Sequence, residues 1–213
     1  MTLKETEIKE LQQLGLFSVR SFMRLKSTVL ATIACVTPVL AFAHGSHGSG
    51  VMSGFTHPIF GFDHAIAILG AGILAYLLRP SRWYIAVLAF VGAMIVGGLF
   101  GIGNEATLAV EKTIASSVLI IGLLIIFRER INFNIVLGLL VIFGAFHGFA
   151  HGAEMDPENT AGKYVTGYTL GALLVGTVGM LFAKGLYSIS SRPLLFTTVG
   201  AIVAALGVMI LLG

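Results

Sequence analysis

Long apolar segments alternate with short polar connections along most of this 213-residue chain. Each of six segments has about 20 mainly apolar residues, enough for a helix to cross a hydrocarbon core about 30 Å thick. The segments cover residues 58–78, 83–101, 106–127, 131–152, 164–183 and 193–212. Because the connections are short, the pattern predicts an all-α integral membrane protein, with one six-helix transmembrane domain over residues 57–213.

Composition agrees with this prediction and excludes other classes of protein. Apolar residues make up 56% of the chain and charged residues only 11%, far from the balance of a soluble domain. The net charge of +3 comes from basic residues scattered singly between apolar segments, which excludes a nucleic-acid-binding patch. The single cysteine, Cys35, lies in the N-terminal region, so disulfides and thiolate metal sites are excluded from the remainder.

The N-terminal region is typical of a secreted or inserted protein. The segment from Met23 to Ala43 has a basic start, a short apolar core and a small-x-small end, which predicts a cleavable signal peptide. Residues 1–43 are therefore expected to be an N-terminal extension plus signal peptide, with translation favoured to start at Met23. Lipoprotein processing at Cys35 is the weaker alternative, because the apolar core before it is short.

Cleavage after the signal would leave His44 as the new N-terminus. Residues 44–56 are rich in Gly and Ser and are expected to form a flexible periplasmic lead-in that carries His44 and His47. These two histidines are weaker candidates for capturing an incoming metal ion, and a plain polar linker is the alternative.

Loop charges give an independent test of orientation. If His44 lies outside, the outer loops hold only two basic residues, Lys112 and Lys163. The inner loops then hold Arg79, Arg82, Arg128, Arg130, Lys184 and Arg192. This bias follows the positive-inside rule and predicts a multi-pass membrane protein with both mature termini on the outer side.

The first apolar segment opens with the motif "HPIFGFDH", from His57 to His64. Pro58 suits the first position of a helix, with His57 just before it in an N-cap-like position. His64 follows seven residues after His57, so the two imidazoles are expected on nearly the same face of one helix.

The fourth apolar segment ends with "FHGFAHGAE", from Phe146 to Glu154. His147, His151 and Glu154 share one helical face by their spacing. In the predicted topology both motifs lie at the outer face of the membrane, where they can meet. A small-xxx-small ridge that favours close helix packing is formed by Gly144, Gly148 and Gly152.

Ionisable groups within a membrane segment are costly and indicate function. Imidazole and carboxylate without thiolate suit a divalent transition metal such as nickel, cobalt or zinc. The six predicted metal ligands are His57, Asp63, His64, His147, His151 and Glu154. Glu111 is a weaker candidate, because it could equally be an interfacial carboxylate paired with Lys112.

Three stretches resemble the HupE/UreJ family of bacterial nickel/cobalt permeases, which are accessory to hydrogenase and urease. They are "HPIFGFDH", "VEKTIASSV" over 110–118 and "FGAFHGFAHGAE" over 143–154. The resemblance implies uptake of nickel or cobalt by secondary or facilitated transport, for hydrogenase, urease or cobalamin, with no prosthetic group. It also implies a location in the bacterial inner membrane, with both mature termini in the periplasm. It assigns metal recognition to the six residues above, with Glu111 as a contributor. The fifth segment departs from the family pattern, because it has Gly176 near the place where a further histidine is expected.

Other functions use the same residue types. A membrane zinc hydrolase could use Glu154 as its base and Ser117 as a polarising group, and a non-transporting metal sensor needs only the ligands. A b-type haem fits less well, because His147 and His151 lie on one face of one helix. No Walker motif is present, so ATP hydrolysis is not expected.

We therefore predict a transporter rather than an enzyme. Its partners are a divalent metal ion and the lipid bilayer, and a homo-oligomer is compatible with the sequence. Imidazole binds metal only when neutral, so uptake is expected to weaken below about pH 6.

Overall fold

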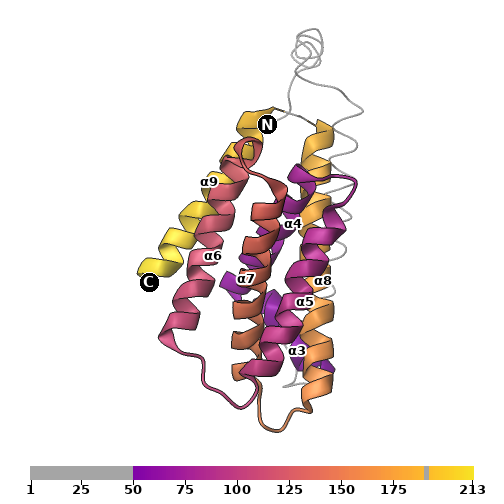
Figure 1. Ribbon diagram of the computed structural model, residues 1–213, viewed down its shortest axis with the longest axis vertical. Helices are drawn as coiled ribbons and strands as arrows, with labels where there is room; N and C mark the ends of the chain where they lie inside the picture. Colours follow the sequence, from indigo (N-terminus) through magenta and orange to yellow (C-terminus); the bar gives the residue numbers. More distant parts are fainter. Residues whose placement is uncertain (1–49, 190–191) are drawn as a thin grey trace, which may run out of the picture.

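The computed structural model describes residues 50–189 and 192–213, which form seven α-helices, one 3-10 turn and no strand (Figure 1). The helices are α3 (Val51–Phe60), α4 (Phe62–Leu78), α5 (Trp83–Gly101), α6 (Leu108–Ile126), α7 (Phe133–Ala153), α8 (Ala161–Ile189) and α9 (Pro193–Leu212), and the turn is η1 (Arg128–Arg130). The predicted signal peptide and lead-in histidines, His44 and His47, lie outside the described residues.

The predicted class of fold is confirmed. Five of the described helices, α5 to α9, are long and apolar enough to cross a membrane, and α3 with α4 makes a sixth span if the two count together. Helices α5 and α9 have the predicted bounds, whereas α8 is longer than the apolar segment within it. The chain is therefore a helical membrane protein.

The first span differs from the prediction, because it is broken. Its helix starts at Val51 rather than at Pro58, so residues 51–56 are helical, Pro58 lies inside α3, and His57 is not an N-cap. At Gly61 the backbone becomes extended, and α4 leaves at 79° to α3. His57 and His64 therefore lie on two helices rather than on one face of a single helix.

Packing on α8 explains why the chain is helical before Pro58. An added Cβ at Gly54 of α3 would lie 2.1 Å from the carbonyl oxygen of Tyr164, and one at Gly167 of α8 would lie 2.1 Å from that of Val51. Such close approach between backbones requires glycine on both helices. Hydropathy alone cannot detect this contact.

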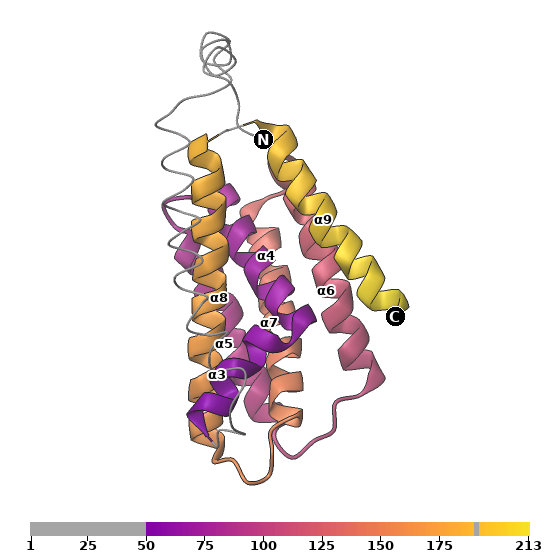
Figure 2. The same cartoon turned by 180° about the vertical axis from the view of Figure 1, so that it is seen from behind.

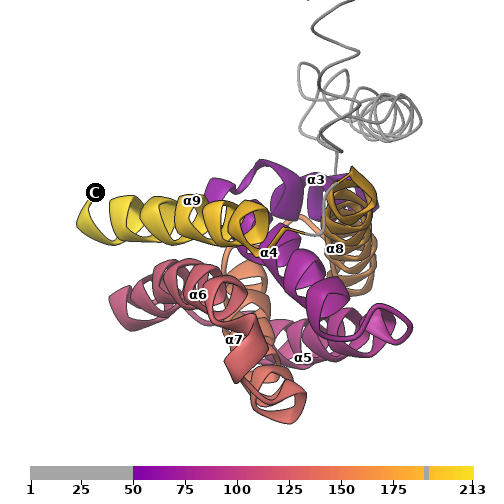
Figure 3. The same cartoon turned by 90° about the horizontal axis from the view of Figure 1, so that it is seen from above.

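The helices form a bundle in which each helix has a main partner. Helix α5 packs on α7, α6 packs on α9, and α3 and α4 both pack on α8 (Figures 1 and 3). Helix α9 leans away from α8 (Figure 2). The α5–α6 and α7–α8 connections lie at the same end as α3, and the other connections lie at the opposite end (Figure 1). All the basic residues predicted for inner loops belong to that opposite end.

The predicted glycine ridge of α7 faces α5. An added Cβ at Gly148 would lie 1.9 Å from the carbonyl oxygen of Met94, and one at Gly152 would lie 2.1 Å from that of Gly98. Side chains at these positions are therefore excluded. The tight α5–α7 pair fixes the helix face from which His147 and its neighbours project.

Candidate metal centre

Four imidazoles from three helices pack together at the end of the bundle where α3 lies. The ring of His64, from α4, is 4.5 Å from that of His151 and 5.1 Å from that of His147, both from α7. The ring of His57, from α3, is 4.8 Å from that of His151 and 6.2 Å from that of His64. The prediction that the two motifs meet is confirmed by these distances, although three helices rather than two supply the rings.

The three inner imidazoles are buried. His147 and His151 have no exposed surface, and His64 is 5% exposed. Among the described residues, Nε2 of His64, Nε2 of His147 and both ring nitrogens of His151 are buried without a hydrogen-bond partner. Buried polar atoms are normally paired, so four unpaired nitrogens within one cluster of rings call for an explanation.

Hydrogen bonds determine which ring nitrogens remain available to bind a metal ion. His147 Nδ1 donates to the carbonyl oxygen of Phe143, 2.9 Å away, and His64 Nδ1 lies 2.7 Å from Oδ1 of Asp63. With the proton on Nδ1 in each ring, Nε2 carries the lone pair that a metal ion would accept. Asp63 thus orients the His64 ring, as carboxylates do behind the histidine ligands of metal proteins.

The outer end of the cluster is a pair between α3 and the end of α7. His57 Nε2 lies 2.7 Å from Oε2 of Glu154, and their side chains are 31% and 42% exposed. The hydrogen bond from His57 is the main reason that the pKa of Glu154 is lowered from its ordinary value. This carboxylate is therefore ionised and in contact with solvent.

The spacing of the rings fits shared ligation. Two imidazoles bound to one ion at about 2.1 Å from each nitrogen have ring centres roughly 5 Å apart. Three of the ring pairs lie between 4.5 and 5.1 Å. In the described part of the chain, no group of three or more His, Cys, Asp or Glu side chains converges in a ready metal-binding geometry. Both acidic groups of the cluster are hydrogen-bonded to imidazoles.

Some predicted residues lie apart from the cluster. Glu111, in the first turn of α6, is exposed, and no hydrogen bond or ion pair joins it to an imidazole in the described residues. The same residues contain no ion pair between Glu111 and Lys112. Gly176 of α8 serves helix packing, because an added Cβ at Gly72 of α4 would lie 2.0 Å from its carbonyl oxygen.

Two tyrosines of α8 join the cluster, and the sequence reasoning missed them. The Tyr168 ring stacks on that of His151 at 5.4 Å, and its hydroxyl lies 3.4 Å from the carbonyl oxygen of Met94. Tyr164 lies 6.2 Å from His57 between ring centres, and its hydroxyl is buried without a partner among the described residues. The i, i+4 spacing of these tyrosines is a signal that could have found them.

Comparison with known proteins places the chain in a family. The family described as HupE / UreJ protein matches residues 31–210. Protein HupE of Rhizobium leguminosarum bv. viciae is 32% identical over 188 residues, which cover 88% of this chain and 97% of that protein. No solved structure matches the chain. On the extent of both matches, the chain belongs to the HupE/UreJ family.

Proposed function

We propose that the protein is an uptake permease for nickel or cobalt in the bacterial inner membrane. The observation that carries this proposal is the row of imidazoles, which leads from the half-exposed His57 to the fully buried His147. Unpaired nitrogens along that row offer ligands to a cation where lipid and apolar side chains offer none. The resemblance of the motifs to nickel/cobalt permeases supports the choice of these two ions.

The ion first meets the ionised carboxylate of Glu154. Its charge attracts a divalent cation, and the ion replaces the hydrogen bond between Glu154 and His57 with bonds to both side chains. His151 lies within 5 Å of both His57 and His64 between ring centres, so it can receive the ion from one and share it with the other.

The deeper step uses His64 and His147. Asp63 holds the Nδ1 proton of His64 and the carbonyl oxygen of Phe143 holds that of His147, so both rings present Nε2 without tautomer exchange. Metal affinity typically falls 10- to 100-fold when such an orienting partner is lost. We therefore infer that Asp63 positions His64, in addition to the ligand role that the sequence predicts for it.

The histidine end faces the periplasm in this proposal, and the arginine-rich end faces the cytoplasm, as the positive-inside rule favours. Transport is secondary or facilitated. The transported ion is the metal that hydrogenase, urease or cobalamin requires.

A zinc hydrolase is less well supported. An enzyme of that kind needs a substrate cleft beside the metal. The buried rings of His147 and His151 lie 5.1 and 4.5 Å from that of His64 between ring centres, a spacing that suits a bare ion better than an organic substrate.

Flux measurements test the proposal. Radioactive Ni²⁺ or Co²⁺ influx would be followed into proteoliposomes that contain the wild type, His64→Ala, His147→Ala or the matched exposed variant Glu158→Gln. We expect saturable influx in the wild type and in Glu158→Gln, and strong loss in both histidine variants. Tight metal binding without influx in any protein would instead identify a sensor or a hydrolase.

A further inference from the structure

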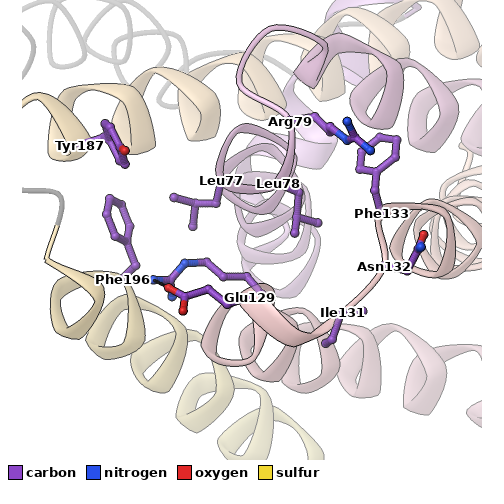
Figure 4. Close-up of a pocket in the computed structure, with 10 residues that line it drawn as sticks. Leu77, Leu78, Arg79, Glu129, Ile131, Asn132, Phe133, Tyr187 and Phe196 are labelled. Atoms are coloured by element: carbon purple, nitrogen blue, oxygen red, sulfur yellow. Dashed lines mark hydrogen bonds and ion pairs between the residues drawn. The ribbon is translucent and has the colours of Figure 1, made fainter.

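A cavity of about 510 Å³ opens at the end of the bundle opposite the histidines. It lies where the end of α4, the turn η1 and the start of α7 meet α8 and α9 (Figure 4). Its lining combines apolar and charged side chains: Leu77, Leu78, Arg79, Arg128, Glu129, Ile131, Asn132, Phe133, Tyr187 and Phe196. The volume is within the range of pockets that hold small molecules.

Arg128 is fixed on one side of this cavity. Its guanidinium lies 5.4 Å from the ring centre of Phe196 and donates to the carbonyl oxygen of Ile125 at 3.1 Å. It also donates to Oε1 of Glu129 at 3.2 Å, and its side chain is only 9% exposed. Glu129 therefore balances the charge of Arg128, while the guanidinium retains further N–H donors.

Arg79 supplies positive charge that no described carboxylate balances. Its guanidinium lies 5.6 Å from the ring centre of Phe133, on the opposite side of the cavity from Phe196 (Figure 4). Within residues 50–189 and 192–213, no carboxylate forms an ion pair with it. The start of α7 borders the same space, with Asn132 as its N-cap, and adds the positive end of the helix dipole. The cavity therefore attracts an anion and repels a divalent cation.

We infer that this cavity binds the phosphate group of an anionic amphiphile. Guanidinium groups match phosphate oxygens in geometry and charge. Leu77 and Leu78 lie between Phe196 and Arg79 in the cavity lining and present apolar surface beside the anion site (Figure 4). The cavity also lies where the spans end, at the level of lipid headgroups, so a phospholipid is the source that fits best. A soluble phosphate compound shares the chemistry and is the other source.

Thermal unfolding of the purified protein in detergent tests this inference. The probes are phosphatidylglycerol, phosphatidylcholine and inorganic phosphate, added at constant ionic strength to the wild type, Arg79→Gln and Arg82→Gln. Arg82 is the matched control, because it is an exposed arginine of the same loop that does not line the cavity. We expect phosphatidylglycerol, but not phosphatidylcholine, to raise the Tm of the wild type and of Arg82→Gln.

In Arg79→Gln we expect the apparent affinity for phosphatidylglycerol to fall about tenfold, the effect of losing one charged hydrogen bond. An equal response to inorganic phosphate, also lost in Arg79→Gln, would support the anion site and assign it to a soluble compound. Native mass spectrometry of retained phosphatidylglycerol gives a second readout if Arg79→Gln unfolds early. Equal responses to both lipids, or equal losses in both arginine variants, would overturn the inference.

Discussion

Replacing His151 by phenylalanine tests whether His151 is a metal ligand or only a packing residue. The His151 side chain is fully buried, and both of its ring nitrogens lack a partner among the described residues. It stacks on Tyr168 at an interplanar angle of 14°, a contact that another aromatic ring can keep. In His151→Phe the stack is therefore retained and the two nitrogens are removed.

The expected effects of His151→Phe on the free energy of unfolding have opposite signs without and with metal. An unpaired buried polar group costs about 1–3 kcal/mol, so its removal should leave the metal-free protein as stable as the wild type or more so. With Ni²⁺ at 100 times its Kd, the wild type should gain about 2.7 kcal/mol. If the variant binds 100-fold more weakly, its gain at the same concentration falls to about 0.4 kcal/mol.

Thermal unfolding in detergent, with and without buffered Ni²⁺, measures both effects. Glu158→Gln serves as the control, since this exposed residue lies at the same end of the bundle and outside the cluster. The reasoning is refuted if His151→Phe unfolds several degrees lower without metal yet keeps the full metal response. That result would make His151 a packing residue.

Three further predictions follow from particular contacts. Gly148→Leu should abolish folded protein, because its Cβ would lie 1.9 Å from the carbonyl oxygen of Met94. Gly138→Leu on the same helix should still fold, because an added Cβ there has nothing within 4 Å; yield and size-exclusion profiles compare the two variants. Glu154→Gln should raise the KM for Ni²⁺ influx about tenfold with little change in Tm, because it removes the charge but keeps the size; an unchanged KM would contradict the role of Glu154 in capture. The hydrogen bond from His57 lowers the pKa of Glu154 and keeps this carboxylate ionised, so the difference in KM between the wild type and Glu154→Gln should persist from pH 7 to 5.5; a difference that vanishes at the lower pH would contradict capture by an ionised Glu154.

The sequence was sufficient to predict most of the membrane spans, but it did not predict the break in the first. Long uniform apolar segments predict α5 and α9 with the observed bounds, and a charged residue, Arg82 or Arg192, directly precedes each of them. The first segment is apolar on average on both sides of Gly61, despite Asp63 and His64, so a hydropathy window cannot detect the break there. The break depends on packing of α3 against α8, which joins residues more than 100 positions apart and leaves no local pattern.

For the site too, some features could be predicted from the sequence and others depend on the packing of distant residues. The predicted topology was sufficient to bring His57, His64, His147 and His151 to one end of the bundle, although the spacing of His57 and His64 wrongly placed them on one helix. The roles of the acidic groups depend on orientation, and only the structure places Asp63 behind His64 and Glu154 beside His57. Tyr164 and Tyr168 were missed because tyrosine in a membrane segment is usually a packing or interfacial residue.

X-ray absorption spectroscopy of the nickel-loaded protein tests most directly whether imidazoles from different helices hold one ion. The account predicts at least two imidazole nitrogens at about 2.1 Å from nickel in the wild type. It also predicts fewer in His64→Ala, because His64 is the ring that contacts the other three. A nickel shell of oxygen ligands alone, unchanged in His64→Ala, would contradict the account.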